Sequence, residues 1–281
     1  MNVEYQSLKK INLESVLILF NKIYSDYYWP NQHTLNSLKQ LMQYMNIDTG
    51  LSTVLLKNNK PIGLALIAKR DNNCWLYCFG IIPSNRGLGY GKNLLEYILK
   101  LIKENNILKM GLEVLLQNKK ARQLYNKNGF KRYCYLDSYS LSGPIQPCSY
   151  KQYSHKDSLT EDAYLKYMQL NKMQDVWSRS YETLLKRKIN WLTAYYKSEP
   201  VAILAYNNHK SLSIYRLDSL DQFHSERALH SLLNVAQLKN PQCSRKVAVN
   251  INHNNISENK ILSCVGFKRF MRQEFLVKTN N

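Results

Sequence analysis

The order of hydrophobic and polar positions predicts alternating helices and strands in the first half of the chain. Apolar residues recur at helical spacing over 13–24, and Thr34 is placed to cap a second helix. Two short apolar runs, 52–57 and 61–68, flank a polar turn, which is the pattern of a β-hairpin. This alternation of element types predicts an α/β fold.

The pattern continues beyond the hairpin. An apolar run leads into the glycine-rich stretch 86–91, and a helix with leucines and isoleucines on one face follows. Asn118 is placed to open a shorter helix, and Asn128-Gly129 has the composition of a helix end. The expected elements are a strand over 74–82, a helix to Glu104, a strand over 110–116, a short helix from Asn118 and a strand over 130–141.

The second half of the chain repeats features of the first. The sequence Gly-Phe-Lys-Arg at 129–132 recurs at 266–269, an offset of 266 − 129 = 137. Asn118 matches Asn255 at the same offset, 255 − 118 = 137. Matches in the same order at a constant offset indicate a duplicated domain. The turn-rich stretch 142–147 separates the copies, so we expect domains at 1–143 and 158–281 and a linker at 144–157.

Charge and cysteine content narrow the function classes. Lysine and arginine exceed aspartate and glutamate by 39 − 20 = 19, so the chain is suited to acidic partners such as an acidic protein segment, nucleic acid or a ribosome. None of the six cysteines forms a Cys-x-x-Cys pair, and the sequence predicts no metal site. The apolar run 15–20 is too short for a membrane span. We expect a cytoplasmic protein, with secretion into a host cell without a cleaved signal left open.

The stretch Arg86-Gly87-Leu88-Gly89-Tyr90-Gly91 has the features of an anion site. It lies between a predicted strand and a predicted helix. Glycines allow close approach of the backbone, and the first N–H groups of a helix point outward at the positive end of its dipole. A pyrophosphate is the anion that we expect to bind there.

These residues resemble the GCN5-related N-acetyltransferase (GNAT) superfamily. Arg86, Gly89 and Gly91 fit its acetyl-CoA motif, Q/R-x-x-G-x-G/A, and the block from Leu112 to Phe130 is similar to the second motif of its ribosomal-protein and protein N-terminal acetyltransferases. The resemblance covers 51–141 well. It implies two tandem GNAT folds of the α/β (α+β) class, each a mixed, mostly antiparallel sheet flanked by helices.

The resemblance also implies which residues bind the cosubstrate acetyl-CoA. The pyrophosphate is expected on the backbone of the glycine loop, and the pantetheine arm along the preceding strand. A backbone N–H near Ile81 is the expected oxyanion donor. The implied binding residues are Phe79, Gly80, Ile81, Arg86, Gly87, Leu88, Gly89, Tyr90, Gly91, Lys92 and Asn118.

Two residues are candidates for the acid–base chemistry. Glu113 lies in an otherwise apolar strand, and the resemblance assigns its position to the general base; a solvent-facing glutamate is the alternative. Tyr125 lies where the family places a general acid beside the sulfur of CoA, with an aromatic core residue as the alternative. Cys78 and Cys134 have no histidine or aspartate partner in the sequence, so we expect buried thiols.

The second copy lacks the glycines. The corresponding stretch, 220–227, contains two acidic residues, which would repel a pyrophosphate. At the offset of 137, Asn250 takes the position of Glu113 and Leu262 that of Tyr125. We therefore expect the first domain to be catalytic and the second to be a degenerate copy.

The sequence thus predicts an acetyl-CoA-dependent N-acetyltransferase that acts on a protein lysine or N-terminal amine. Two alternatives stay open. One is an acetyltransferase for a small amine such as a polyamine or an aminoglycoside, against which the net charge counts. The other is a non-catalytic module that binds acetyl-CoA, RNA or a ribosome. The size and composition also resemble tandem GNAT effectors that intracellular bacteria inject into host cells.

Overall fold

A computed structural model describes residues 3–28, 32–147, 150–170, 175–209 and 211–280. The chain divides into two compact units. Unit 1 comprises residues 1–133 together with 275–281, and unit 2 comprises residues 134–274.

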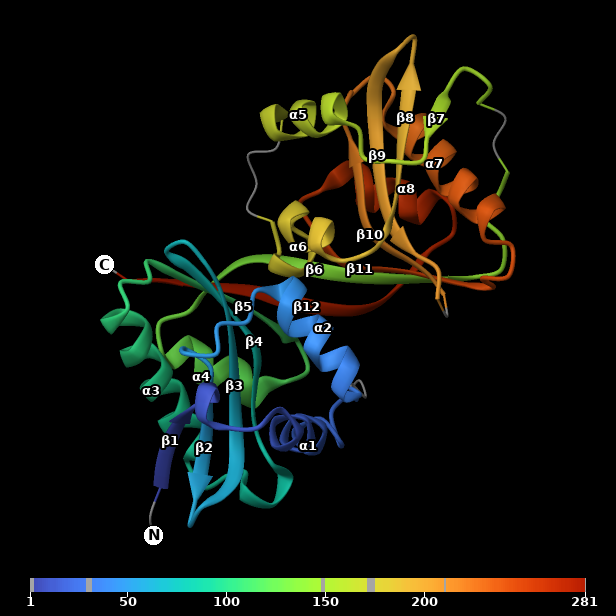
Figure 1. Ribbon diagram of the computed structural model, residues 1–281. Helices are drawn as coiled ribbons and strands as arrows, with labels where there is room; N and C mark the ends of the chain where they lie inside the picture. Colours follow the sequence, from blue (N-terminus) through green and yellow to red (C-terminus); the bar gives the residue numbers. More distant parts are fainter. Residues whose placement is uncertain (1–2, 29–31, 148–149, 171–174, 210, 281) are drawn as a thin grey trace. The chain divides into compact units, whose positions relative to one another are not determined.

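Unit 1 is built on a mixed sheet (Figure 1). All strand pairings between β1 and β4 are antiparallel, and β4 pairs with β5 in parallel. The strands are, in sheet order, β1 (Val3–Ser7), β2 (Thr53–Lys57), β3 (Lys60–Arg70), β4 (Asn73–Ile81), β5 (Lys109–Leu115) and the final part of β12 (Lys268–Thr279).

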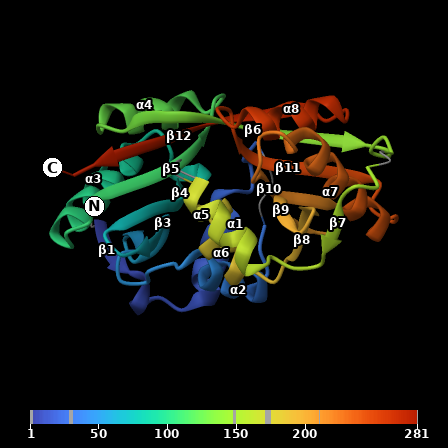
Figure 2. The same cartoon turned by 90° about the horizontal axis from the view of Figure 1, so that it is seen from above.

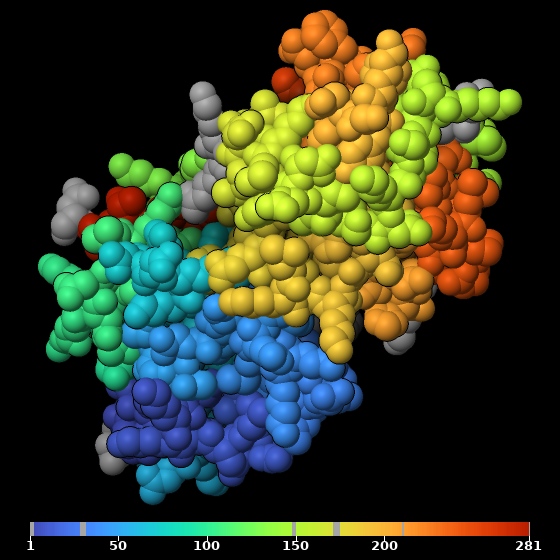
Figure 3. All heavy atoms as spheres, turned by 45° about the horizontal axis from the view of Figure 1, so that its top comes forward, coloured from blue at the N-terminus to red at the C-terminus, as the bar shows by residue number. Residues whose placement is uncertain are grey.

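Helices cover both faces of this sheet. Figure 2 shows α1 (Leu13–Ile23) and α2 (Leu35–Met45) on one side, and α3 (Tyr90–Glu104) and α4 (Lys119–Lys127) on the other. Short 3-10 turns, η1 (Leu8–Lys10) and η2 (Pro83–Asn85), precede α1 and α3. On the face shown in Figure 3, the early part of the chain, drawn in blue, forms much of the surface of unit 1.

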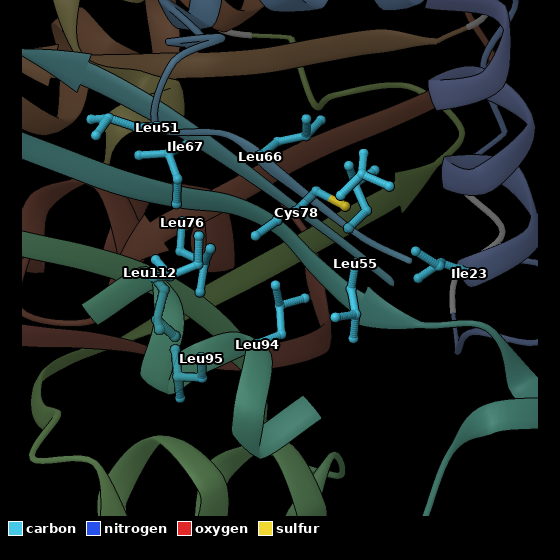
Figure 4. Packing of buried hydrophobic residues seen from close by; sticks show 14 of the residues in the cluster. Ile23, Leu51, Leu55, Leu66, Ile67, Leu76, Cys78, Leu94, Leu95 and Leu112 are labelled. Carbon is cyan, nitrogen blue, oxygen red and sulfur yellow. The ribbon is translucent and has the colours of Figure 1, made fainter. Parts of the chain in front are cut away.

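Amphipathic periodicity fixes these helices to the sheet. Leu94 and Leu95 of α3 are fully buried and lie beside Leu76 of β4 and Leu112 of β5 (Figure 4). Thr34 caps α2 in a capping box with Ser37, as the sequence predicts. The predicted strands and helices of the first half are all present; the pattern analysis missed only the short strand β1 and the 3-10 turns.

Unit 2 repeats the plan. Its helices also lie on both faces of a sheet, and β10 pairs with β11 in parallel as β4 does with β5. Its elements are β6 (Lys131–Ser142), β7 (Ser154–Lys156), α5 (Glu161–Leu170), η3 (Trp177–Arg179), α6 (Tyr181–Lys186), β8 (Asn190–Tyr196), β9 (Glu199–Asn207), β10 (Leu212–Ser219), α7 (Ser225–Lys239), β11 (Arg245–Asn252), α8 (Ile256–Cys264) and the first part of β12.

The bounds of the units differ from the predicted domain bounds. Most of β6 belongs to unit 2, where it pairs with β11, whereas residues 275–281 belong to unit 1. The predicted linker, 144–157, also lies in unit 2, because Ile145 is fully buried in its core and β7 pairs with β8. The last strand of each repeat thus crosses a unit boundary: β6 begins in unit 1 and continues in unit 2, and β12 begins in unit 2 and ends in unit 1.

A close aromatic contact sets the packing of β5 in unit 1. A Cβ atom added to Gly111 would lie 2.3 Å from Cζ3 of Trp75 and 3.2 Å from Cε2 of Phe275. The rings of Trp75 and Phe275 are 4.8 Å apart between centroids. The two rings leave no room for a side chain at position 111.

We expect Gly111→Ala to destabilise unit 1 by about 1–3 kcal/mol, because the methyl group would overlap the indole ring. Gly91→Ala is the matched control, since the nearest atom to its added Cβ, Cγ1 of Ile81, is 3.9 Å away. Urea unfolding measures both variants. Equal stability of Gly111→Ala and the wild type would contradict this account of the packing.

Candidate functional site

The pairing between β4 and β5 ends partway along both strands. The parallel ladder joins Asn73–Leu76 to residues 109–112, but β4 continues to Ile81 and β5 to Leu115. A bulge at Tyr77 interrupts the pairing of β4 with β3 at this point. In the described part of the chain, the pairings of residues 79–81 all run to β3. The opposite edge of this segment can therefore accept an extended ligand as an added strand.

The glycine loop lies where β4 leads into α3. Gly87 and Gly89 have φ of +79° and +83°, values that L side chains rarely adopt, and an added Cβ at either would meet nothing within 4 Å. Gly89 is the N-cap of α3 and has no side chain to cap the first N–H groups, and the first turn contains no acidic residue. These N–H groups form an open, positively polarised cradle for an anion.

The side chain of Arg86 connects the glycine loop to neighbouring parts of unit 1. Its Nε donates to the carbonyl oxygen of Ile81 at 2.9 Å, and Nη2 donates to that of Ile23 at 2.8 Å. Its two terminal nitrogens form a bidentate ion pair with Asp26 at 2.8 and 3.0 Å, and this hydrogen bonding lowers the pKa of the Asp26 carboxyl. Arg86 thus joins the end of β4 to the end of α1.

The other predicted residues of the loop differ in exposure. Leu88 is 62% exposed, and the side chain of Lys92 is 66% exposed with its Nζ 3.7 Å from Glu96. Tyr90 begins α3, and Lys57 of β2 lies over its ring at 5.3 Å from the centroid. An exposed lysine beside an anion cradle adds favourable charge without a fixed contact.

Strand β4 packs closely against α1. A Cβ on Gly80 would lie 2.4 Å from Cγ2 of Ile23, so only glycine fits there. Phe79 is partly buried and lies beside Tyr125 of α4, with ring centroids 6.1 Å apart. The segment of β4 that follows the end of the ladder is therefore held between α1 and α4.

Tyr125 lies in a cluster of hydroxyl and thiol groups. It is 6% exposed, and burial, with smaller contributions from nearby Tyr27 and Cys78, raises the pKa of its hydroxyl above the ordinary value of 10. The hydroxyl of Tyr24 is hydrogen-bonded to the thiol of Cys78, and burial raises the pKa of that thiol to about 12. Tyr125 is therefore a protonated donor at neutral pH, and Cys78 is a buried thiol, as predicted.

Asn118 connects this cluster to α4. Its Oδ1 accepts from the N–H of Ala121 at 3.2 Å and so caps the helix, as the sequence predicts. Its side chain is also hydrogen-bonded to Tyr27, and the neighbouring Tyr28 donates to the carbonyl oxygen of Gln117 at 3.3 Å. The segment after α1 thus lies over the turn between β5 and α4. Tyr24 and Tyr27 could not be identified as site residues from the sequence, because no motif distinguishes them among 21 tyrosines.

Glu113 follows the end of the β4–β5 ladder directly. It is partly buried, and its neighbours Leu112 and Val114 are 1% and 4% exposed. By strand alternation Glu113 lies on the same face of β5 as Gly111, and Leu112 lies on the opposite face with α3. The structure therefore places a carboxylate at the point where the two strands stop pairing.

Unit 2 has the same bulge but different chemistry. Tyr215 is the extra residue in β10, as Tyr77 is in β4. Counted from the bulge, Arg216 takes the position of Cys78, and Asp218 takes that of Gly80. The guanidinium of Arg216 is buried and bonds to Asp218 at 2.6 and 3.1 Å and to Asp175 at 2.9 Å. In unit 2, side chains of the protein itself therefore occupy the place that corresponds to the segment of β4 after the bulge.

A second buried ion pair lies nearby in unit 2. Arg179 donates to Glu258 at 2.6 Å, and both side chains are less than a tenth exposed. Burial raises the pKa of the Glu258 carboxyl to about 7, although Arg179 acts in the opposite direction. Asn255 caps α8 and donates to Glu258 at 3.1 Å.

The loop before α7 in unit 2 carries its own carboxylate. Oδ1 of Asp221 accepts from the N–H groups of Phe223 and His224 at 2.7 and 3.1 Å. Both donors directly precede α7, which begins at Ser225, so this carboxylate lies in the loop that corresponds to the glycine loop of unit 1. An internal carboxylate at this place disfavours an external phosphate, as expected from the acidic residues in the sequence.

One predicted correspondence needs correction. The ladders of the two units end at Leu112 and at Ala248, an offset of 248 − 112 = 136, whereas the caps Asn118 and Asn255 differ by 137. Counted from the ladder, Val249 takes the position of Glu113. Asn250 is an extra residue in a bulge, with φ of +56°. A single offset of 137 between the two copies does not account for the extra residue in β11.

No three histidine, cysteine, aspartate or glutamate side chains among the described residues converge as a metal site requires. No helix among them combines the length and apolar character that crossing a membrane takes.

The comparisons with known proteins agree with this geometry. The model of the acetyltransferase (GNAT) family matches residues 17–130. A curated protein from Haemophilus influenzae, [ribosomal protein bS18]-alanine N-acetyltransferase, is 36% identical over 80 residues, which are 28% of this chain and 54% of the relative. The matched region thus spans about half the length of that relative.

Solved structures show the same fold over nearly the whole chain. A tandem GNAT protein from the clavulanic acid biosynthesis pathway has a TM-score of 0.74 at 12% identity, covering 99% of this chain and 98% of its own. A GCN5-related N-acetyltransferase from Sphaerobacter thermophilus has a TM-score of 0.71 at 11% identity, covering 99% and 95%. The expected tandem fold is confirmed, whereas these matches give no support to the resemblance to injected effectors.

We expect Gly89→Ala to weaken binding of acetyl-CoA by tenfold or more, since a side chain at φ of +83° would shift the N–H cradle. Gly143→Ala is the matched control, because Gly143 has φ of +94° and equally open surroundings. Calorimetry should find one acetyl-CoA per wild-type chain. Two equal sites would contradict our interpretation of unit 2, and unchanged affinity in Gly89→Ala would contradict the role of the loop.

The raised pKa of Glu258 predicts a dependence of stability on pH. The unfolded carboxyl has an ordinary pKa near 4.5, so the folded state binds the proton more tightly and loses stability as the pH rises through about 7. We expect the wild type to lose on the order of 2–3 kcal/mol relative to Glu258→Gln between pH 4 and 8. Urea unfolding at several pH values measures this difference. Parallel profiles for the two proteins would show that the carboxyl does not titrate in this range.

Proposed function

We propose that unit 1, whose residues 17–130 match the model of the acetyltransferase (GNAT) family, transfers the acetyl group of acetyl-CoA directly to a primary amine of a protein. The observation that carries the proposal is the end of the β4–β5 ladder at Leu76 and Leu112. The glycine loop follows β4 beyond this point, Glu113 follows in β5, and Tyr125 packs against Phe79. These groups together meet the requirements of acyl transfer.

The residues of unit 1 fit acetyl-CoA in charge and in hydrogen-bonding groups. The N–H groups at the start of α3 would hold the pyrophosphate, and the edge of residues 79–81 would pair with the amides of the pantetheine arm. A backbone N–H near Ile81 would donate to the carbonyl oxygen of the thioester. The side chain of Arg86 has a supporting role, because it is bonded to the protein on three sides.

Acetyl-CoA supplies an activated acetyl group: the amine nitrogen forms the amide bond, the carbon–sulfur bond breaks, and the released thiolate gains a proton. Glu113 would accept the proton of the ammonium group, through water where the distance requires it. Tyr125 would donate a proton toward the sulfur, because burial keeps its hydroxyl protonated. Cys78 has a pKa of about 12 and no role as a nucleophile in this scheme.

Two observations favour a protein acceptor. The curated relative is named for acetylating an alanine of a ribosomal protein, and its similarity to this chain is 36% over 80 residues. A net charge of +19 repels polyamines and attracts acidic protein segments. We therefore propose an N-terminal amine as the first acceptor to test and a lysine as the second. We propose that the enzyme acts in the cytoplasm or, after export, in a host cell.

The acceptor is identified by measuring release of CoA thiol with three amines: a peptide with a free N-terminal alanine, an N-blocked peptide with one lysine, and spermidine. We expect CoA thiol to be released with one of the two peptides at least ten times faster than with spermidine. Activity with spermidine alone would overturn the protein acceptor while leaving acetyl transfer in place. Binding of acetyl-CoA without turnover of any acceptor would favour a non-catalytic module.

We expect Glu113→Gln and Tyr125→Phe each to lower kcat by ten- to a thousandfold, because each removes a proton-transfer group. The dissociation constant of acetyl-CoA, measured by calorimetry, should stay unchanged, since Glu113 lies in β5 and Tyr125 in α4, outside the glycine loop that holds the pyrophosphate. Glu104→Gln and Tyr5→Phe are matched controls, because both residues lie outside the candidate site. Full activity in both variants would overturn the assigned roles.

A further inference from the structure

Strand β5 has two different neighbours along its length. Up to Leu112 it pairs with β4, and its other neighbour in the sheet is β12. Beyond Leu112 the ladder to β4 has ended, while β5 itself continues through Glu113 to Leu115. The residues of β12 that belong to unit 1 begin at Phe275.

We propose that Phe275 is a positioning residue for Glu113. This inference rests on the proposed function, in which Glu113 is the general base. Phe275 itself is fully buried and is placed to act through β5 and not on the substrate.

The ring of Phe275 lies against the face of β5 that carries Glu113. Its Cε2 is 3.2 Å from the position of a Cβ on Gly111, two residues before Glu113 on the same face. Its centroid is 4.8 Å from that of Trp75 and 5.2 Å from that of Tyr133. The packing of these three aromatic rings against Gly111 thus fixes the position of β5 two residues before Glu113, the proposed base.

Two further contacts hold this part of β12 in unit 1. Asn280 donates from its backbone N–H to Leu108 at 2.8 Å and from its side chain to the carbonyl oxygen of Ile107 at 2.7 Å. Leu276 is fully buried in the core of unit 1. Because these contacts fix the strand directly after Phe275, the Phe275 ring has one defined place against β5.

The glycine loop does not depend on these contacts. Arg86 holds it through Ile81, Ile23 and Asp26, none of which touches Phe275 in the described contacts. Loss of the Phe275 ring should therefore lower kcat and leave the affinity for acetyl-CoA unchanged. A purely structural role would instead lower stability without changing the turnover of the folded protein.

A double-mutant cycle in the full chain tests the proposal, with kcat measured on the peptide with N-terminal alanine. We expect Phe275→Ala to lower kcat on the order of ten- to a hundredfold, because small misplacements of a reacting group have effects of this size. In the Glu113→Gln background the same change should cost less than threefold, since no base is left to position. Phe275→Leu replaces Phe275→Ala in the cycle if the alanine variant does not fold.

Leu38→Ala is the control for stability, because Leu38 is fully buried in α2, a helix that carries none of the candidate site residues. Its loss of thermal stability should come without loss of kcat. An equal kcat loss from Phe275→Ala in both backgrounds, or an unchanged kcat, would overturn the positioning role while the function of unit 1 stands. Full activity of Glu113→Gln alone would instead overturn the proposed base, and with it the positioning role.

Discussion

The parallel hydrogen bonds between β4 and β5 stop at Leu76 and Leu112, and both strands continue. A sheet that opens in this way exposes backbone donors and acceptors within an otherwise closed core, which a folded protein tolerates only where a partner satisfies them. The bulge at Tyr77 starts the separation, and Gly80 lets α1 approach the freed segment of β4. The glycine loop, the tyrosine cluster and Glu113 are arranged around the opening that results.

The two units show how one backbone plan supports two kinds of interior. Both have a bulge at the same place in the strand, yet the position after it is a small thiol in unit 1 and a guanidinium in unit 2. Burial of Arg216 is tolerated because its described partners are Asp218, Asp175, Tyr167 and a backbone carbonyl. Such a network satisfies its own polar groups, so it leaves nothing for a ligand to complete. In unit 1 the positions that correspond to Arg216 and Asp218 hold Cys78 and Gly80, so no charged side chain stands there.

The sequence predicted those parts of the site whose backbone needs particular residues. Gly87 and Gly89 have positive φ, and Asn118 caps a helix, so local chemistry identifies all three. It did not predict the contacts that depend on tertiary packing. Nothing near Asp26 or Tyr27 indicates that one meets Arg86 and the other Asn118, because these partners are 60 and 91 residues away in the sequence (86 − 26 = 60 and 118 − 27 = 91).

The assignment of most of β6 to unit 2 and of the end of β12 to unit 1 could not be predicted from the sequence for a different reason. Both strands are 12 residues long and begin at the lysine of the same Gly-Phe-Lys-Arg sequence, so hydrophobic pattern and propensity fit either strand to either unit. The choice is made by contacts such as that of Phe275 with Gly111, which are separated by 275 − 111 = 164 residues. Contacts of such long range form late and close a large loop. The packing beneath Glu113 is therefore completed only after β12 has reached unit 1, which ties the geometry of the site to a strand distant in sequence.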